Sequence, residues 1–351
     1  MKVKKLLSGA LALGLAMSMG LTAFAATGDT TVKKIYKLTN ANTTSPAETF
    51  SFSELKCYKV TNAASDVTVD DVPTPTISSA TYAAGEATAD GTGTGTEEVT
   101  FSIPTDYESV GVYYYYFTET AGSTAGVDYS SQLMALVVTV TNDSTSTSGG
   151  FKTNIAIHQA TKGNDGTITL GDKVNTITNT YSAGSLKVTK EVTGNFGDKK
   201  KAFTVFVTFT KPAGKTVSST IKYTDGSDGS SVAPGDWGSN GQAIVEVKLK
   251  DGQTATFTNI PYGVTYTVKE ADYTGDKGGY DAAEYAYTDG TTGKTTKVID
   301  SAEEAATVTN NKGTTPDTGI SLDSLPYIMM LAIAGVGLVV FVAKKRSMRE
   351  D

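Results

Sequence analysis

Three residue types with complementary chemistry recur in the same order in the two halves of the sequence. Lysine supplies an amine, asparagine supplies a carboxamide, and a protonated glutamate can polarise the asparagine carbonyl and then move protons between the two. The candidates are Lys34, Glu119 and Asn179 in the first half, and Lys190, Glu270 and Asn310 in the second half. An uncharged amine that attacks the asparagine side chain would release ammonia and form an isopeptide bond.

The strand phase of Lys190 shows why these residues stand out. In the stretch SLKVTKEVTG (185–194), Leu186, Val188 and Val192 alternate with polar residues, and Lys190 falls in step with the apolar set. Successive side chains of a strand point to opposite faces, so this phase directs Lys190 into the predicted core. The same test places the other five candidates on the inward faces of their own strands.

Inward charges of this kind have three interpretations. A lone inward lysine on an edge strand commonly prevents sheet-to-sheet aggregation, but a trio that occurs twice is not explained in that way. A buried ion pair with an amide partner would satisfy the charges, although such pairs rarely add net stability. Burial also lowers the pKa of lysine and raises the pKa of glutamate, which favours a neutral amine beside a protonated acid. We therefore favour bond formation, and the buried ion pair is the alternative.

Internal similarity divides the chain into two units. The openings TVKKIYKLTN (31–40) and LKVTKEVTG (186–194) correspond, and so do the closing segments NTITNTY (175–181) and ATVTNNK (306–312). Repeats of this length indicate tandem domains. Thr, Val, Tyr and Gly are abundant and turn residues occur throughout, which is typical of all-β sandwiches. We expect one domain over residues 26–181 and a second over 182–313.

Composition excludes several classes of protein. Between residues 26 and 318 the chain has 23 basic and 34 acidic residues, a net charge of −11 that disfavours nucleic acid as a partner. Cys57 is the single cysteine, so an internal disulfide is excluded. The sequence has no zinc-ligand pattern, phosphate loop or Gly-x-Ser-x-Gly elbow, and it has one histidine, His158. We therefore expect no cofactor, no metal and no enzyme activity.

Both ends of the chain predict export. Three lysines, an apolar run and Ala23-Phe24-Ala25 fit a secretory signal peptide over residues 1–25. Residues 325–343 are apolar and close to the length that spans a bilayer, and a basic tail (344–351) follows them. The body of the chain is thus expected outside the cell, with the membrane as a partner of the precursor only.

A short motif before the second apolar segment resembles the cell-wall sorting signal of Gram-positive surface proteins. The motif TPDTG consists of Thr315, Pro316, Asp317, Thr318 and Gly319. The usual form of this signal is LPxTG, and Thr315 stands here in place of leucine. The resemblance implies that a sortase cleaves between Thr318 and Gly319 and passes Thr318 to an amine.

Both halves resemble the isopeptide-forming domains of Gram-positive backbone pilins, and they are most similar to the streptococcal T-antigen type. The resemblance is strongest at GVYYYYFTET (111–120), LKVTKEVTG (186–194) and YTVKEADY (266–273). It implies an immunoglobulin-like sandwich in each domain, with a Lys–Asn bond promoted by glutamate. The implied bonds are Lys34–Asn179 with Glu119, and Lys190–Asn310 with Glu270.

The same family implies how the subunits are joined. A lysine just before the last strand of the first domain accepts the terminal threonine of the next subunit. The matching segment LGDKVNTITN (170–179) nominates Lys173, and Lys152, Lys162 and the run 199–201 are competitors.

The predicted function is the major shaft subunit of a sortase-assembled pilus, secreted and anchored to the cell wall. Its predicted partners are sortase, neighbouring subunits and peptidoglycan or a basal pilin. Host-surface ligands are a further class of partner that the sequence does not identify. The alternative is a monomeric wall-anchored adhesin or minor pilin built from the same domains.

Overall fold

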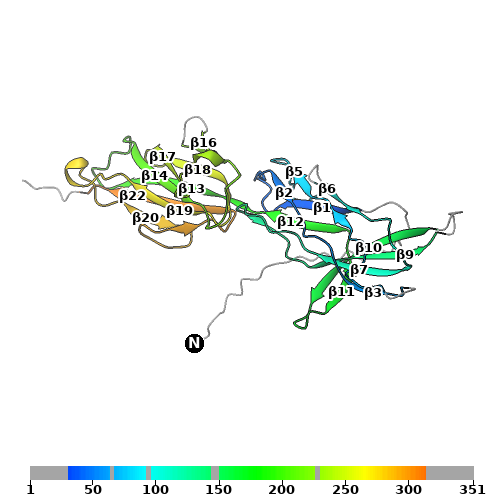
Figure 1. Cartoon of the computed structure of the whole chain (residues 1–351). Coiled ribbons are helices and arrows are strands. Elements are labelled where there is room, and N and C mark those ends of the chain that lie inside the picture. The colour runs from blue at the N-terminus through cyan, green and yellow to red at the C-terminus, as the bar shows by residue number, and fades with distance from the viewer. Residues whose placement is uncertain (1–30, 64–66, 92–95, 144–149, 226–229, 314–351) are drawn as a thin grey trace, which may run out of the picture.

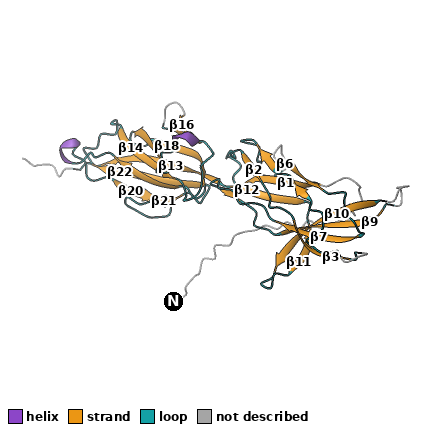
Figure 2. Ribbon diagram, in the orientation of Figure 1, coloured by secondary structure: helices purple, strands orange, loops and turns teal. Residues whose placement is uncertain are grey.

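The computed structural model describes residues 31–63, 67–91, 96–143, 150–225 and 230–313. The predicted signal peptide (1–25), sorting motif (315–319), membrane helix (325–343) and basic tail (344–351) lie outside these residues. In the part of the chain that is described, the helices η1 (Pro234–Asp236) and η2 (Gly275–Lys277) are single 3-10 turns, too short to cross a bilayer. Every other regular element among the described residues is a β-strand, as Figure 2 shows.

Domain 1, which contains strands β1 to β12, packs two five-stranded sheets over one core. The first sheet has the order β4-β6-β1-β12-β8, and the second has the order β11-β10-β9-β7-β3. A separate pair is formed by β2 and β5. The strands are β1 (Thr31–Leu38), β2 (Glu48–Phe50), β3 (Lys56–Thr61), β4 (Thr76–Ile77), β5 (Ala80–Tyr82), β6 (Thr96–Ser102), β7 (Gly111–Phe117), β8 (Val127–Asp128), β9 (Met134–Asn142), β10 (Phe151–Lys162), β11 (Ile168–Lys173) and β12 (Thr176–Tyr181).

Domain 2, which contains strands β13 to β22, is a second sandwich with its own core. Its sheets have the orders β16-β15-β18-β13-β22-β20 and β17-β14-β19-β21. The strands are β13 (Ala183–Thr193), β14 (Phe203–Thr210), β15 (Ile221–Thr224), β16 (Ser230–Val232), β17 (Gln242–Leu249), β18 (Thr254–Pro261), β19 (Thr265–Glu270), β20 (Glu284–Tyr287), β21 (Lys297–Val298) and β22 (Glu303–Asn311). The expected all-β fold of two tandem sandwiches is confirmed, and the two lobes lie end to end (Figure 1).

Period-two patterning explains why these segments form half-buried strands. In β14, the apolar residues at alternate positions are buried and the intervening residues are only partly covered. In β7, Tyr113, Tyr115 and Phe117 are buried by the same alternation, while the ring of Tyr58 packs beside Tyr114 and Tyr116 on the other face. Aromatic and β-branched side chains are favoured on such surfaces because they pack against cross-strand neighbours.

The first and last strands of each domain are neighbours that run parallel. In domain 1, β1 pairs with β12, and Asn179 lies opposite Tyr36, two residues beyond Lys34. In domain 2, β13 pairs with β22, and Asn310 lies opposite Val192, two residues beyond Lys190. The offset is the same in both domains. It puts each asparagine on the same face as its lysine, one diagonal step along the neighbouring strand.

Candidate functional site

The first site is assembled from three segments that are distant in sequence. Lys34 lies in the middle of β1 and Asn179 lies in β12. We expected Glu119 within a strand, but β7 ends at Phe117. Glu119 nevertheless keeps its inward direction because its backbone forms an isolated antiparallel bridge with Phe52.

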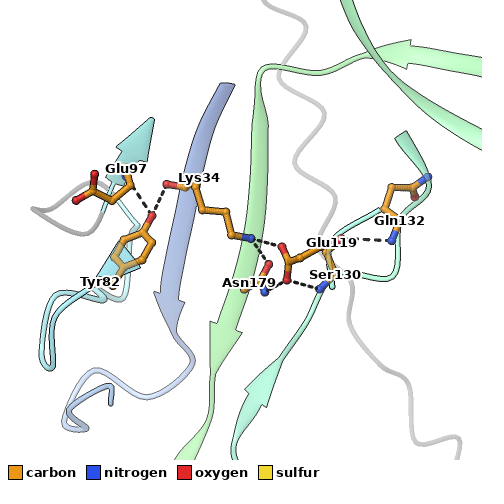
Figure 3. Close-up of polar contacts among 7 residues, drawn as sticks. All are labelled: Lys34, Tyr82, Glu97, Glu119, Ser130, Gln132 and Asn179. Carbon is orange, nitrogen blue, oxygen red and sulfur yellow. Dashed lines mark hydrogen bonds and ion pairs between the residues drawn. The ribbon is translucent and has the colours of Figure 1, made fainter. Parts of the chain in front are cut away.

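The side chains of this site form a closed set of polar contacts (Figure 3). The Nζ atom of Lys34 lies 2.6 Å from Oε2 of Glu119, and it also donates a hydrogen bond to Oδ1 of Asn179. The Nδ2 group of Asn179 donates to Oε1 of Glu119, and the Ser130 amide donates to the same oxygen at 3.3 Å. One carboxyl group therefore bridges the amine of Lys34 and the amide nitrogen of Asn179.

Burial of Lys34 favours the neutral form of its amine, and an aromatic ring covers that amine. Lys34 is fully buried and Asn179 is 1% exposed. Burial lowers the pKa of Lys34 to about 8, although the charge of Glu119 and its hydrogen bond act in the opposite direction. The Phe50 ring faces the amine, with its centroid 4.4 Å from Nζ, and the Tyr82 hydroxyl donates to the backbone carbonyl of Lys34 at 2.5 Å.

The second site repeats this arrangement in domain 2. The Nζ atom of Lys190 donates to Oδ1 of Asn310 at 2.5 Å, and Nδ2 of Asn310 donates to Oε2 of Glu270 at 2.7 Å. The other carboxyl oxygen, Oε1 of Glu270, lies 3.5 Å from Nζ. Unlike Lys34, Lys190 also donates to two backbone carbonyls, those of Glu191 at 2.7 Å and Val308 at 2.9 Å.

Burial shifts both ionisable groups of the second site toward their neutral forms. It lowers the pKa of Lys190 against the opposing charge of Glu270, and it raises the pKa of Glu270 against the hydrogen bond from Asn310. The centroid of the Phe203 ring lies 4.6 Å from Nζ, in the position that Phe50 takes in domain 1. Glu270 and Asn310 also line a surface pocket of about 300 Å³.

The contacts fit one of the two tasks that we expected of glutamate, the movement of protons, and not the other. We expected each acid to polarise the asparagine carbonyl, but that oxygen accepts its hydrogen bond from lysine in both sites. The carboxyl group contacts the amide nitrogen instead, because the carbonyl oxygen is already directed at the amine. In this position it can take a proton from the attacking amine and give one to the departing nitrogen.

The structure thus brings all six predicted residues together as two separate trios. Lys173 is exposed at the end of β11, and so are its competitors Lys152 and Lys162 on β10. Sequence reasoning missed the aromatic rings over the amines, Phe50 and Phe203. Nothing in the sequence distinguishes these rings from ordinary core aromatics.

Known proteins resemble the chain over nearly its whole length. Residues 30–182 match the family described as Spy0128-like isopeptide containing domain, and residues 184–312 match a domain of unknown function, DUF7601. A pilin of Streptococcus pyogenes serotype M1 is 28% identical over 350 residues, which cover 93% of this chain and 96% of that protein. The chain is a pilin homologue.

Solved structures share the fold of this pilin homologue. The major pilin T3.2 of Streptococcus pyogenes serotype GAS13637 has a TM-score of 0.53 at 22% identity, covering 80% of this chain and 96% of that one. A crystal structure of a major pilin from Streptococcus pyogenes has a TM-score of 0.51 at 24% identity, covering 81% of this chain and 98% of that one. At these identities the structural likeness establishes the fold, and the chemistry of the site depends on the contacts described above.

Proposed function

We propose that this chain is the shaft subunit of a covalently polymerised pilus, and that each domain closes its own Lys–Asn isopeptide bond. The observation behind this proposal is the twice-repeated buried trio, which in each domain connects the first strand to the last. An ordinary buried ion pair would explain one site poorly and two equivalent sites worse, because it rarely adds net stability. The match to pilins supports the same function.

The proposed reaction conserves atoms without a cofactor. A proton moves from the lysine ammonium to the glutamate carboxylate, which leaves a neutral amine and a neutral acid. The amine nitrogen then attacks Cγ of asparagine, and the bond from Cγ to Nδ2 breaks. The acid protonates the departing nitrogen, the amine loses its extra proton to the carboxylate, and ammonia leaves. The chain consumes its own side chains, so each site turns over once.

Bond closure would stabilise each domain and redirect mechanical force. The bridged residues are 145 positions apart in domain 1 and 120 apart in domain 2. By analogy with disulfides, a cross-link that closes a loop of this length lowers the conformational entropy of the unfolded chain. This raises the free energy of unfolding of each domain by about 5 kcal/mol. In domain 2, tension that enters along β13 would cross from Lys190 to Asn310 and leave through the last residues of β22. The segment between these two residues would bear no tension.

Assembly of the subunits is the second part of the proposal. We infer that a sortase joins Thr318 to Lys173 of a neighbouring subunit, and that the terminal subunit is attached to peptidoglycan or a basal pilin. The exposure of Lys173 supports this role, since an acceptor amine must reach an enzyme. Because Lys173 precedes β12 directly, tension applied there would pass into domain 2 without crossing the rest of domain 1.

Intact mass of the folded chain tests the two bonds. Each bond removes one ammonia, about 17 Da, so two bonds lower the mass by twice that amount. Fragment masses should then identify Lys34–Asn179 and Lys190–Asn310 as the linked pairs. A full-length chain with the unmodified mass would refute the bond assignment.

Polymerisation is tested separately in cell-wall extracts. The wild-type chain should produce a ladder of high-mass species that resists boiling in SDS, and Lys173→Ala should abolish it. Lys152→Ala and Lys162→Ala are matched controls, because both lysines are exposed on the same domain. An intact ladder in Lys173→Ala together with a lost ladder in one of the controls would move the acceptor to that lysine.

A further inference from the structure

One loop of domain 1 starts at Glu119 and returns to the carboxyl group of the same residue. We call the segment from Glu119 to Ser130 the strap. At its start, the carboxyl group of Glu119 contacts the amine of Lys34. At its end, the backbone amide of Ser130 donates to Oε1 of the same carboxyl group at 3.3 Å. The position of this carboxyl group therefore depends on both ends of the strap.

The middle of the strap is docked on domain 2. The amide of Ala125 donates to the carbonyl of Thr216 at 2.8 Å, and the amide of Thr216 donates to the carbonyl of Ser123 at 2.8 Å. These bonds form a parallel bridge between Thr124 and Thr216. The Ala125 side chain is 2% exposed and belongs to the core cluster of domain 2, although the residue belongs to domain 1 in sequence.

The strap then returns to β12, the strand that carries Asn179. Gly126 adopts a φ of 79°, and a Cβ atom there would lie 2.5 Å from the carbonyl oxygen of Ser182, 2.9 Å from the Tyr181 ring and 3.1 Å from Cβ of Pro261. Beyond it, β8 pairs with the two residues that follow Asn179 in β12. Close packing at the domain junction thus fixes the strap directly beside Asn179.

We propose that docking of the strap on domain 2 positions Glu119, so that the bond of domain 1 closes only after domain 2 has folded. This inference rests on the proposed isopeptide chemistry. Ala125, Gly126 and Thr216 act as positioning residues, because none of them touches the reacting atoms. Without its partner on domain 2, the strap would be a long loop whose ordering costs conformational entropy. The carboxyl group would then spend less time between the amine and the amide nitrogen, and the bond would close more slowly.

A pair of glycine variants perturbs the packing at the domain junction in the full-length chain. Gly126→Ala introduces a methyl group against the backbone of Ser182 at the junction. Gly166→Ala makes the same change at a similar φ of 85°, in domain 1 but with no atom near the new methyl group. Both variants therefore carry the strain of a side chain at positive φ, but only Gly126→Ala also creates a steric clash.

The assay follows each cross-link separately during synthesis of the chain. Cell-free translation is stopped with acid at intervals, and the linked peptides of the two domains are measured by mass. Gly126→Ala should slow closure of Lys34–Asn179 at least tenfold relative to Gly166→Ala. Closure of Lys190–Asn310 should keep its wild-type rate in both variants, which shows that domain 2 folds normally.

A second pair of variants tests the contact of Ala125 with the core of domain 2. Ala125→Asp places a charge in the core of domain 2 and should slow closure of the Lys34–Asn179 bond. The smaller change Ala125→Ser should leave the rate of closure at its wild-type value. Hydrogen exchange of β7 and β9 should be unchanged, since their sheet contains no strand of the strap.

Two outcomes would overturn the inference: equal closure rates in Gly126→Ala and Gly166→Ala, or a domain 1 bond that closes in wild type before domain 2 is synthesised. Absence of the Lys34–Asn179 link from the wild-type chain would refute the proposed function itself.

Discussion

Replacing Glu270 by glutamine tests the proton-transfer role with little change in shape. The glutamine side chain would keep an oxygen and a nitrogen where the carboxyl oxygens were, but it has no proton to give at neutral pH. Domain 2 is the better domain for this test, because Lys190 retains the carbonyls of Glu191 and Val308 as hydrogen-bond acceptors. In domain 1, the carboxyl group of Glu119 is a main partner of Lys34, so its removal would add a cost of its own.

The expected effect has a kinetic and a thermodynamic part. General acid–base catalysis by one residue contributes about 10²–10⁴-fold, so Glu270→Gln should slow closure of the domain 2 bond by roughly that factor. Without the bond, the unfolded chain between Lys190 and Asn310, which are 120 positions apart, is not closed into a loop. The free energy of unfolding of domain 2 should then fall by about 5 kcal/mol in the chain-entropy model.

Mass and denaturant unfolding measure the two parts on the same sample. The Glu270→Gln chain should retain one ammonia more than the wild type, about 17 Da, and fragment masses should show the Lys34–Asn179 link unchanged. Unfolding in guanidinium chloride should shift the transition of domain 2 to a lower midpoint. The transition of domain 1 serves as the internal control.

Two results would refute this reasoning. A closed Lys190–Asn310 bond that forms at the wild-type rate would show that the Glu270 carboxyl group does not transfer the proton. A missing bond with an unchanged unfolding midpoint would show that the cross-link does not stabilise the domain.

Two further predictions concern pH and force. Burial lowers the pKa of Lys34 to about 8, so above that pH the Lys34 amine has lost the proton that it would pass to the carboxyl group. Closure of the domain 1 bond should therefore slow about tenfold per pH unit on the basic side, and a rate that still rises above about pH 9 would exclude glutamate as the proton donor. In single-molecule pulling between Lys173 and the C-terminal end of β22, the wild-type chain should not extend by unfolding. Asn310→Ala should release on the order of 40 nm as domain 2 unfolds, and Asn179→Ala should release none; any other pattern contradicts the proposed path of tension.

The identity of the trio residues was predictable from sequence because strand phase is a local property. Alternation over a few residues puts Lys190 on the face of Leu186 and Val188, and the structure buries all three. The same local pattern predicted Asn179 and Asn310 correctly as inward residues. For Glu119 the inward direction was predicted correctly, but its place within a strand was not. Strand β7 ends before Glu119, and an isolated bridge to Phe52 continues the pairing.

The details of each site depend on contacts that no local pattern encodes. Phe203 is a core phenylalanine by its pattern, and only packing brings its ring to 4.6 Å from the Lys190 amine. The oxygen that each carboxyl group presents to the amide nitrogen is likewise a result of side-chain packing. The docking of the strap on domain 2 gave no signal in the sequence, because its partner Thr216 lies in the other domain.

The sequence by itself determined which side chains are inward and reactive in type, because a strand of a few residues already sets the direction of each side chain. Only the tertiary structure decided that they meet. Lys34 and Asn179 are 145 residues apart, and their contact requires β1 and β12 to be parallel neighbours with Asn179 opposite Tyr36. That register is set by the packing of two whole sheets over one core, since a shift of one residue would turn Asn179 away from the amine.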